Sequence, residues 1–557
     1  MSSLAPENSE LLKEYPALLA HLLYDRGIRT KEEADRFLQP NFERDTYDPM
    51  LLHDMEKACV RIYEALEAQE KIVIYSDYDC DGIPGAVLLF DFFKKINYTN
   101  VSVYIPDRHS EGYGLHTEAV KRFVEEKVSL LITIDLGISN NESIAQATAS
   151  GITVIVTDHH EPPEELPRAY ALVNPKLGSY PDTMLCGAGV AFKLVQALLK
   201  KYRAVWGIHE GWEKWLLDMA GLATLSDMVP LVNENRTLAY FGLKVIARNK
   251  RLGLQALFDE LMLDPARLTE DDITFMVTPR INAASRMDTP LRAFELLSSD
   301  NLAQAKERAK LLAGINDERK IHVANAMKEV HTVLGKREEV PIIVIGNINW
   351  RVGVLGLIAS KIVEHYNKPA FVWGMEGSTT IKGSCRSDGS IDVVTLMRAS
   401  QKVFLDFGGH ILAGGFSINH ESIHLLESAL LENHHQALRE GSENNAVYFP
   451  MQLSEVTTRT YELVASLAPF GLGNEKPVFA FSDVVIASVK QFGKEKNHLE
   501  LLLSDTKIKV KAIAFFSDKN SFSVEAKEGA ICTVAATLEQ SFFRGKRELR
   551  LRIVDIL

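Results

Sequence analysis

The chain has 557 residues, which at about 150 residues per domain predicts three or four domains. Hydrophobic residues make up 46% of it and charged residues 24%, which excludes wholesale disorder, collagen-like repeats and a coiled-coil rod. With 62 basic and 74 acidic residues the net charge is −12, so an anionic partner would need a local basic cleft or bound metal ions.

The sequence carries no sign of export or membrane insertion. No apolar run approaches the roughly 18 residues that span a bilayer. The first residues carry acids where a signal peptide would carry a basic end. The five cysteines are scattered without a C-x-x-C pair, which is typical of reduced thiols. We therefore expect a cytoplasmic protein with no membrane partner.

The first half of the chain alternates strand and helix patterns. Residues 1–60 are expected to form a helical segment, and residues 61–300 the first large domain. Its short apolar β-branched runs, separated by helical patterns, predict a parallel sheet covered on both faces. The expected strands are 71–75, 101–105, 130–134 and 152–156. The expected helices are 83–95, 116–127 and a helical region over 187–263.

Three further segments follow. Apolar residues at three- and four-residue spacing over 302–334 predict a long amphipathic helix, assigned to a linking segment 301–335. Residues 336–445 resume an α/β pattern and are expected to form a second, smaller lobe. Residues 446–557 show five strands and hardly any helix signal, which indicates an OB-type barrel. Its expected strands are 478–489, 497–504, 507–515, 530–537 and 548–555.

The strongest functional signal is the segment Ser-Asp-Tyr-Asp-Cys-Asp-Gly at 76–82, directly after the first strand. Three carboxylates on one tight loop repel one another unless cations or hydrogen bonds relieve the repulsion. An EF-hand opens in the same way, but it requires a preceding helix and a glutamate at loop position twelve, where this chain has Leu88.

Further acids follow other predicted strands: Asp135 ends one, and Asp158-His159-His160 ends another. Because strand carboxyl ends of an open α/β sheet converge on one crevice, we expect these groups to meet the first loop. Asp227 lies in the helical region, so its convergence is a weaker inference. Oxygen and imidazole ligands without thiolate favour Mn²⁺ or Mg²⁺. Two such ions, about 3.5–4 Å apart, would suit phosphoryl chemistry, although a purely structural acidic site is the alternative.

These motifs resemble the DHH phosphoesterase superfamily. The segment 279–287 (PRINAASRM), the segment 408–416 (GGHILAGGF) and the segment 469–474 (PFGLGN) further resemble the RecJ-type single-stranded-DNA-specific exonucleases, over about residues 20–557. One departure is Ser285, where a glycine is expected in this family. A small residue is expected to preserve the loop there.

The resemblance implies a role for each matching residue. The first metal ion would be bound by Asp77 and Asp79. The second would be bound by Asp81, His159 and Asp227, and Asp135 would bridge the two. His160 would face the scissile phosphate and assist the leaving oxygen. The implied catalytic set is Asp79, Asp81, Asp135, His159, His160 and Asp227.

Several features suit a phosphate backbone. Arg351 precedes a helix expected to begin near Leu355, so it and free N–H groups there could hold a phosphate. The expected substrate-binding residues are Arg280, Asn282, Arg286, Arg351, Ser384, Arg386, His410, Gly414 and Gly415. The barrel adds cations and aromatic rings that suit single strands. These are Lys490, Phe492, Lys494, Lys496, Phe542, Phe543, Arg544, Lys546 and Arg547. Solvated loops and ordinary core packing are the alternative explanation for each.

The function implied by the resemblance is 5′-to-3′ hydrolysis of single-stranded DNA to mononucleotides, in DNA repair and recombination. A helicase and a single-strand-binding protein would be the partners. The alternative enzyme is a DHH phosphodiesterase for short RNA, cyclic dinucleotides or polyphosphate, for which an extra barrel would serve no purpose. A non-enzymatic replication scaffold is the third hypothesis, but a scaffold would not need the full metal-binding set.

Overall fold

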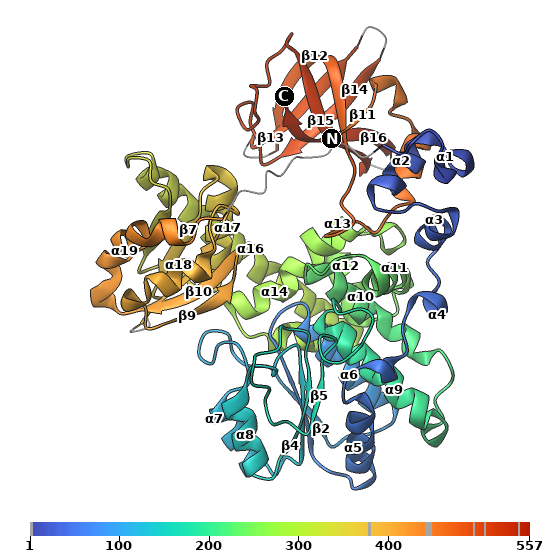
Figure 1. Cartoon of the computed structure of the whole chain (residues 1–557), viewed down its shortest axis with the longest axis vertical. Coiled ribbons are helices and arrows are strands. Elements are labelled where there is room, and N and C mark those ends of the chain that lie inside the picture. Colours follow the sequence, from blue (N-terminus) through green and yellow to red (C-terminus); the bar gives the residue numbers. More distant parts are fainter. Residues whose placement is uncertain (1–3, 377–379, 440–447, 494–495, 506–507, 544–545) are drawn as a thin grey trace. The chain divides into compact units, whose positions relative to one another are not determined.

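A computed structural model of the chain describes residues 4–376, 380–439, 448–493, 496–505, 508–543 and 546–557 (Figure 1). By their internal contacts the residues divide into two compact units. The smaller unit comprises Met1–Thr46, Pro230–Tyr240 and Asn444–Leu557. The larger unit comprises Tyr47–Val229 and Phe241–Glu443. Among the described helices, none combines the length and the apolar character needed to cross a bilayer.

The larger unit begins with a five-stranded sheet in the order β2-β1-β3-β4-β5, all parallel. Its strands are β1 (Ile72–Ser76), β2 (Val101–Tyr104), β3 (Leu130–Ile134), β4 (Thr153–Thr157) and β5 (Ala171–Val173). Every residue of β1 and β3 is buried, because helices cover both faces of the sheet. Figure 1 shows α7 (Thr117–Glu125) and α8 (Asn141–Ala149) on one face, with α5 (Met55–Glu67), α6 (Gly82–Lys95) and α9 (Gly187–Trp206) on the other.

The parallel sheet confirms the predicted fold, and each expected strand lies within one residue of an observed one. Strand β5 was not predicted, because its three residues are too few to show a periodicity. Its pairing with β4 extends the sheet beyond the Asp158-His159-His160 segment.

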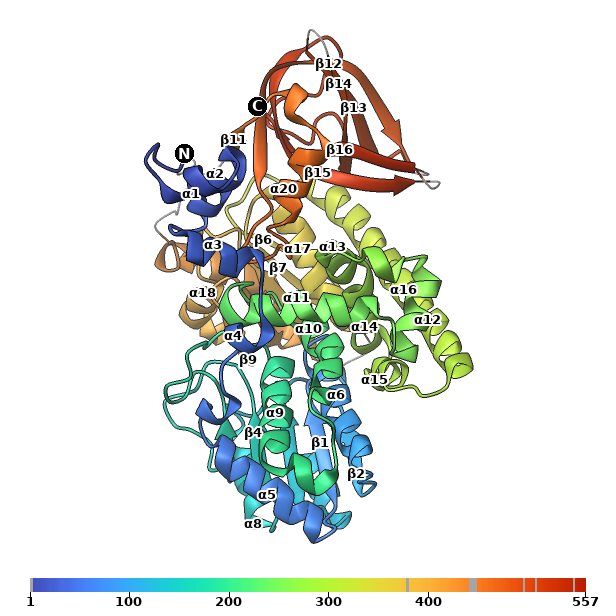
Figure 2. The same cartoon turned by 90° about the vertical axis from the view of Figure 1, so that its right-hand side faces the viewer.

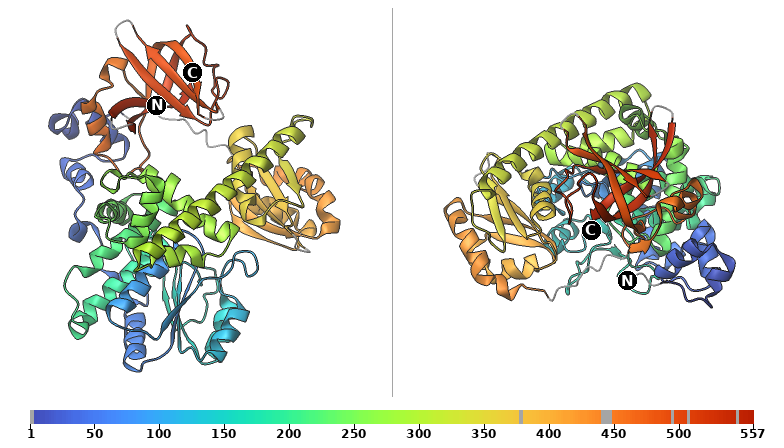
Figure 3. Two further views of the ribbon diagram at one scale, coloured as in Figure 1. Left: turned by 180° about the vertical axis from the view of Figure 1, so that it is seen from behind. Right: turned by 90° about the horizontal axis from the view of Figure 1, so that it is seen from above.

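Helices follow in this part of the chain. They are α10 (Leu217–Ser226), α11 (Asn233–Ala247), α12 (Leu252–Leu261), α13 (Glu270–Asp272), α14 (Thr278–Met287), α15 (Leu291–Leu297) and α16 (Leu302–Leu334). One of them, α11, belongs to the smaller unit as far as Tyr240 and to the larger unit from Phe241. Helix α16 has the predicted bounds, and its N-cap Asn301 accepts a hydrogen bond from the N–H of Gln304. Figure 3 shows its length clearly.

The segment 279–287 corrects one expectation, because it is helical and not a loop. Pro279 lies in the first turn of α14, which directly follows the π-helical turn Ile273–Val277, and the good helix formers Arg280, Ala283 and Ala284 come after it. Ser285 is buried inside this helix. A small side chain is therefore required there by packing.

The second lobe of the larger unit has a mixed sheet in the order β6-β7-β8-β10-β9. Its strands are β6 (Ile343–Asn347), β7 (Ala370–Gly374), β8 (Ile381–Arg386), β9 (Asp406–His410) and β10 (Ala413–Ile418). Helix α17 (Leu355–Tyr366) joins the one parallel pair, β6 and β7, while the other pairs are antiparallel. The lobe also contains α18 (Val393–Ala399) and α19 (Leu426–Asn433), and it confirms the predicted second α/β lobe.

The smaller unit contains a ring of five strands with β11 at its side. The strands are β11 (Tyr448–Pro450), β12 (Val478–Phe492), β13 (His498–Ser504), β14 (Lys509–Phe515), β15 (Ile531–Phe543) and β16 (Lys546–Ile556). Pairing of β12 with both β13 and β15 closes the ring, which confirms the OB-type barrel. Helix α20 (Thr458–Ala465) precedes it and was not predicted.

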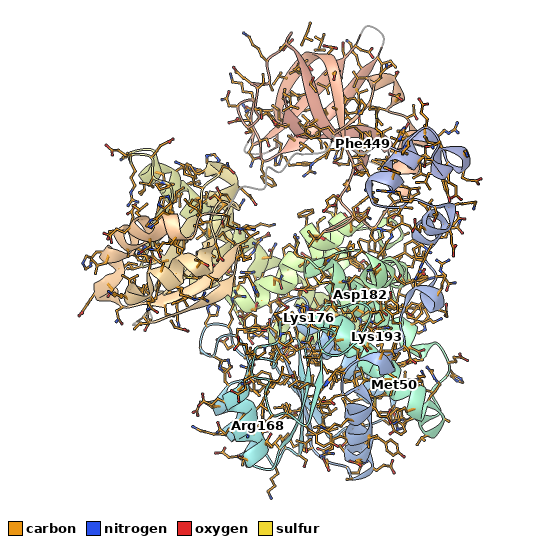
Figure 4. All side chains as sticks on the ribbon, viewed as in Figure 1. Met50, Arg168, Lys176, Asp182, Lys193 and Phe449 are labelled. Carbon is orange, nitrogen blue, oxygen red and sulfur yellow. The ribbon has the colours of Figure 1, made fainter. Side chains whose placement is uncertain are left out.

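The N-terminal helices α1 (Glu10–Glu14), α2 (Ala17–Asp25), α3 (Lys31–Leu38) and α4 (Phe42–Asp45) belong to the same unit (Figure 2). Leu11 and Leu22 share one hydrophobic core with Phe449, which Figure 4 labels, and with the barrel residue Phe479. The amino-terminal helices and the barrel are therefore one packed body rather than separate appendages.

Candidate metal centre

The acidic loop lies between β1 and α6 and folds back on itself. One carboxylate oxygen of Asp79, Oδ1, accepts hydrogen bonds from the N–H groups of Asp81 (2.8 Å) and Gly82 (3.2 Å). A Cβ at Gly82 would stand 2.5 Å from the carbonyl oxygen of Asp77, so only glycine permits this turn. The loop thereby keeps Asp77, Asp79 and Asp81 close together at the carboxyl end of β1.

The first residues of α9 hold a second side of the centre. Asp81 accepts hydrogen bonds from the N–H groups of Gly187 (2.6 Å) and Ala188 (2.8 Å), which lie at the positive end of that helix. A Cβ at Gly187 would lie 2.5 Å from the Cβ of Asp135. The glycine therefore lets α9 pack directly against a carboxylate of the neighbouring strand.

Three other elements deliver the remaining groups. Asp135 follows β3 with a left-handed backbone (φ 62°), a strained conformation for aspartate that turns its side chain into the crevice. His159 and His160 follow β4, and Asp227 caps the carboxyl end of α10. The structure thus brings together all seven residues expected at the metal centre, including Asp227, whose convergence was the weaker inference.

His159 stands at the middle of this cluster. Its Nε2 atom lies 3.1 Å from Oδ1 of Asp135, 3.6 Å from Oδ2 of Asp227 and 3.7 Å from Oδ2 of Asp81. Three sets of ligand atoms fall within 4.8 Å of one another. They are Asp77, Asp79 and Asp135; Asp81, His159 and Asp227; and Asp135, His159 and His160.

Burial makes the accumulated negative charge unfavourable. Burial first, and then the neighbouring carboxylates, raise the pKa of Asp77, Asp135 and Asp227 well above the usual aspartate value. The pKa of Asp81 is also raised by burial, although the facing His159 opposes this. Burial lowers the pKa of His159, which favours the neutral imidazole that binds metal ions.

The donor set fits a divalent cation. Buried oxygens of Asp77 (Oδ1), Asp135 (Oδ1) and Asp227 (Oδ2) have no hydrogen-bond partner among the described residues. Buried acceptors are normally satisfied, so oxygens left over in one cluster point to a missing positive partner. Carboxylates with one or two imidazoles and no thiolate match the preferences of Mn²⁺ and Mg²⁺.

Asp158 is a functional residue that the sequence reasoning named but gave no role. It is buried, and Oδ1 accepts hydrogen bonds from the N–H of His159 (2.7 Å) and from Nδ1 of His160 (2.8 Å). Burial opposes ionisation, but the bond from His160 and the backbone N–H bonds keep the pKa of Asp158 below its usual value. Asp158 therefore fixes the orientation of both histidines.

Tyr113 was missed entirely. Its hydroxyl lies 3.3 Å from Nδ1 of His160, and its ring packs edge-on against the same imidazole at 5.8 Å. It lies on the irregular segment between β2 and α7, where no periodicity marks individual side chains. Its place in the connection that leaves the carboxyl end of β2 is the one signal that could have indicated it.

Beside the acids the larger unit gathers arginines. The positive charges of Arg108, Arg319 and Arg386 act on Arg286 of α14, and the carboxylate of Asp79 acts on it with the opposite sign. Burial, followed by Arg108 and Arg319, lowers the pKa of Arg286 to about 9. None of these four arginines forms an ion pair with a carboxylate in the described part of the chain. The printed hydrogen bonds of Arg286, Arg319 and Arg386 go to neutral acceptors. Guanidinium groups whose charge no carboxylate neutralises suit a phosphate.

Two of those arginines were expected from the sequence and two were not. Arg286 lies in the segment 279–287 that carries the motif resemblance, and Arg386 was expected to bind substrate because hydroxyl side chains flank it. Arg108 lies on the segment after β2, and Arg319 looks like an ordinary surface residue of an amphipathic helix. No sequence pattern marks Arg108 or Arg319, and only the three-dimensional structure associates them with the other two arginines.

The remaining predicted substrate residues divide into two groups. Ser384 receives a hydrogen bond from Arg386 (3.2 Å) and donates one to the carbonyl of Gly414 (3.3 Å), so these three belong together. Gly415 pairs with Ser384 across the strands, and His410 is exposed on the adjacent strand β9.

The other group has partners within the protein. Asn282 accepts a hydrogen bond from the N–H of Cys80 (2.8 Å) and so supports the acidic loop. Arg280 donates to the carbonyl of Met276 (2.7 Å). Helix α17 begins at Leu355 as predicted, but Glu376 occupies the expected anion site. That carboxylate accepts from the N–H of Val352 (2.9 Å) and lies 3.3 Å from Arg351.

On the barrel, His498, Phe515 and Phe516 form an aromatic group with Phe492. The guanidinium of Arg552 lies 4.4 Å from the ring centre of Phe515. Of the barrel residues predicted to bind, Lys494 and Arg544 and the side chains of Phe542, Phe543 and Lys546 lie outside the described residues.

A parallel sheet whose strand ends hold Asp, Asp-His-His and a three-carboxylate loop defines a DHH phosphoesterase, and family models agree along the chain. The DHH family N-terminal domain matches residues 71–224, the DHHA1 domain residues 339–435 and the RecJ OB domain residues 449–555. The chain belongs to the RecJ family of single-stranded-DNA-specific exonucleases.

Full-length relatives carry that assignment. The single-stranded-DNA-specific exonuclease RecJ of Haemophilus influenzae is 33% identical over 97% of this chain and 96% of the relative. RecJ of Bacillus subtilis is 32% identical over 97% of this chain and 67% of the relative. The structure of RecJ from Thermus thermophilus in complex with Mn²⁺ aligns over 100% of this chain and 78% of its own, with 25% identity and a TM-score of 0.82.

Proposed function

We propose that this exonuclease hydrolyses single-stranded DNA from the 5′ end to mononucleotides, in DNA repair and recombination. The observation that carries the proposal is the group of unpaired arginines beside the acidic cluster. The acids suit phosphodiester hydrolysis, and the arginines suit a terminal phosphate held next to the scissile bond. A 5′-terminal phosphate held there would set the polarity of cleavage.

The chain's residues would hold two divalent cations, Mn²⁺ or Mg²⁺. Asp77, Asp79 and Asp135 would bind the first, whereas Asp81, His159 and Asp227 would bind the second with Asp135 shared. Such ions neutralise phosphate charge and lower the pKa of water, which supplies the nucleophile. Asp135 belongs to the first set of ligand atoms and lies 3.1 Å from Nε2 of His159, a member of the second set, which supports its bridging role.

His160 would assist the leaving oxygen. Its side chain is 36% exposed, while that of Asp158 behind it is 1% exposed. Because Nδ1 of His160 is engaged by Asp158, Nε2 is the atom that can reach substrate and pass it a proton. Tyr113 packs on the same ring and limits its rotation.

Arg286, Arg386 and Ser384 would bind the terminal phosphate, with Arg108 and Arg319 added by the structure. Asn282 supports the acidic loop, so its effect on substrate would be indirect. Arg280, His410, Gly414 and Gly415 would contact the strand further along. Arg351 is paired with Glu376 and would have to exchange that partner for a phosphate.

The setting of the reaction is part of the proposal. Substrate would be produced by a helicase and covered by a single-strand-binding protein, because the chain requires unpaired strands. The five cysteines are free thiols, which supports a cytoplasmic location.

The test uses purified full-length chain with Mn²⁺ and end-labelled oligonucleotides. Single strand should be cleaved and duplex spared, and a 5′-phosphate should be preferred to a 5′-hydroxyl. Arg386→Ala should abolish that preference, while Arg398→Ala, an exposed arginine of α18, should preserve it. Release of label from the 3′ end first would refute the polarity. Cleavage of dinucleotides or RNA with oligomeric DNA left intact would favour the alternative phosphodiesterase.

A further inference from the structure

A cavity of about 510 Å³ opens in the larger unit, away from the metal centre. Its walls are the last turn of α6, the 3₁₀ helix η2 (Trp212–Leu216) and the residues that lead into α12. No residue of the metal cluster lines it. Its size falls in the range of about 300–1,000 Å³ that is typical of small-ligand sites.

Two indole rings face this cavity. Trp212 and Trp215 are three residues apart on η2, a spacing that places side chains of a 3₁₀ helix on the same side. Trp215 is 46% exposed, although large aromatic side chains are usually much more buried. Accessible indoles in a concave site offer a stacking surface to a planar ring.

The charged groups of the cavity favour an anion. Its two inner acids, Asp91 and Asp218, both accept hydrogen bonds from the buried guanidinium of Arg251 (2.7–3.1 Å). Lys94 lies near Asp300 (3.7 Å), whereas Lys95 and Lys250 form no ion pair with a carboxylate of the described residues. Nζ of Lys95 lies 5.9 Å from the ring centre of Trp212, so a phosphate there would lie beside an indole. An ammonium ion is an effective phosphate binder.

The stacking surface and the ammonium groups belong to the same cavity. A planar ring joined to an anionic group would use both, and a nucleotide combines the two as its base and its phosphate.

We propose that this cavity binds a deoxynucleoside monophosphate and that the occupied cavity inhibits the nuclease. The inference rests on the proposed function, because mononucleotides are the expected products. The base stacks on Trp215, and the phosphate lies between Lys95 and Lys250.

Two helices connect the cavity with the metal centre. Helix α6 begins beside Asp81 and ends with Asp91 and Lys95 in the cavity wall. Helix α10 begins beside Asp218 in the wall and ends at its C-cap Asp227. A ligand that shifts either helix changes the separation of Asp81 from Asp227. Both acids must stay within 4 Å of His159 for the ligand cluster to persist, so such a shift lowers activity.

Equilibrium dialysis of the full chain with labelled dAMP, in chelator, tests the binding. The proposal predicts two classes of site, because the arginine group also takes a phosphate. Arg386→Ala should remove one class. Trp215→Ala and Lys250→Glu should each weaken the other at least tenfold, whereas Trp215→Phe should retain it. Tyr170→Ala, an exposed aromatic elsewhere in the larger unit, is the matched control. Deoxyadenosine and deoxyribose 5-phosphate should each bind less well than dAMP.

A single class that vanishes in Arg386→Ala would overturn the proposal, as would a second class indifferent to Trp215→Ala. Neither outcome would affect the proposed nuclease activity, which is measured separately. In that assay dAMP bound at the arginine group competes with substrate and raises KM, whereas dAMP in the cavity should lower kcat, by roughly fivefold or more at saturation. Trp215→Ala should keep full basal activity and the competition, and should lose the effect on kcat. An equal fall in kcat in wild type and in Trp215→Ala would disprove the regulatory role.

Discussion

Nε2 of His159 and Oδ1 of Asp135 lie 3.1 Å apart, yet that carboxylate oxygen accepts no hydrogen bond from the described residues. In the tautomer that binds a metal ion, Nε2 carries no proton, and an unprotonated nitrogen this close to a carboxylate oxygen is unfavourable unless a positive group lies between or beside the two atoms. The relationship makes Asp135 the residue on which the charge balance of the centre most depends. Asp135 is therefore expected to be required for activity while its charge lowers the stability of the metal-free chain.

Asp135→Asn should abolish nuclease activity, by at least roughly a hundredfold, while raising the thermal stability of the metal-free chain. The amide keeps the shape of the side chain and removes one of several repelling charges. Melting curves in chelator and in Mn²⁺ measure both effects. Wild type should gain stability from Mn²⁺ by linkage, and the variant should gain much less. Asp300→Asn, on an exposed acid, should change neither quantity. Wild-type cleavage by Asp135→Asn would contradict the site.

Asp158→Asn should reduce kcat by about 10²-fold with little change in KM. The amide can no longer accept all the bonds that hold the two histidines, so His160 loses its orientation. Steady-state kinetics on a 5′-phosphorylated oligonucleotide separates the two parameters. A variant that raises KM and leaves kcat unchanged would show that Asp158 serves binding.

Asp45 is expected to make a pH-dependent contribution to the free energy of unfolding of the smaller unit. Its carboxylate accepts hydrogen bonds from Arg36 (2.7 Å), Arg44 (2.8 Å) and the N–H of Asn41 (2.8 Å). Burial opposes ionisation, but these donors lower the pKa of Asp45 below its usual value. The contribution is therefore fully present above about pH 4, the pKa of an aspartate in the unfolded chain. It disappears as the pH falls through the lower pKa that Asp45 has in the folded state. Asp45→Asn should cost about 1 kcal/mol at pH 7 and nothing in strong acid. Urea unfolding at the two pH values decides this.

The acidic loop was predictable because a cluster of charged residues next to an apolar strand is easily recognised in a sequence. Three carboxylates directly after an apolar strand have no structural purpose of their own, and parallel-sheet topology indicated where Asp135 and His159 would join them. Strand positions were predictable for a similar reason, since apolar runs and their breaks are local signals.

Features that depend on distant contacts were not predictable. Arg108 and Tyr113 lie on an irregular segment with no periodicity, and Arg319 has the appearance of a solvated helix residue. Ser285 was placed on a loop because glycine-like positions suggest turns, although the surrounding residues form helix α14. The shared core of α1 and the barrel joins residues more than 400 positions apart, which no local pattern can reveal.

That shared core decides how barrel binding should be tested. Removing residues 450–557 would expose Leu11 and the other apolar residues of the amino-terminal helices, so a point substitution is a more specific test.

Phe516 is 81% exposed with a strained φ of 54°, and its N–H donates to Nδ1 of His498 (3.0 Å). Because stacking on one base contributes about 1–3 kcal/mol, Phe516→Ala should weaken binding of a 30-nucleotide strand roughly tenfold. Dinucleotide cleavage should be unchanged. Ile531→Ala, 70% exposed on the same barrel, is the control. Equal losses on both substrates would remove the barrel from strand binding.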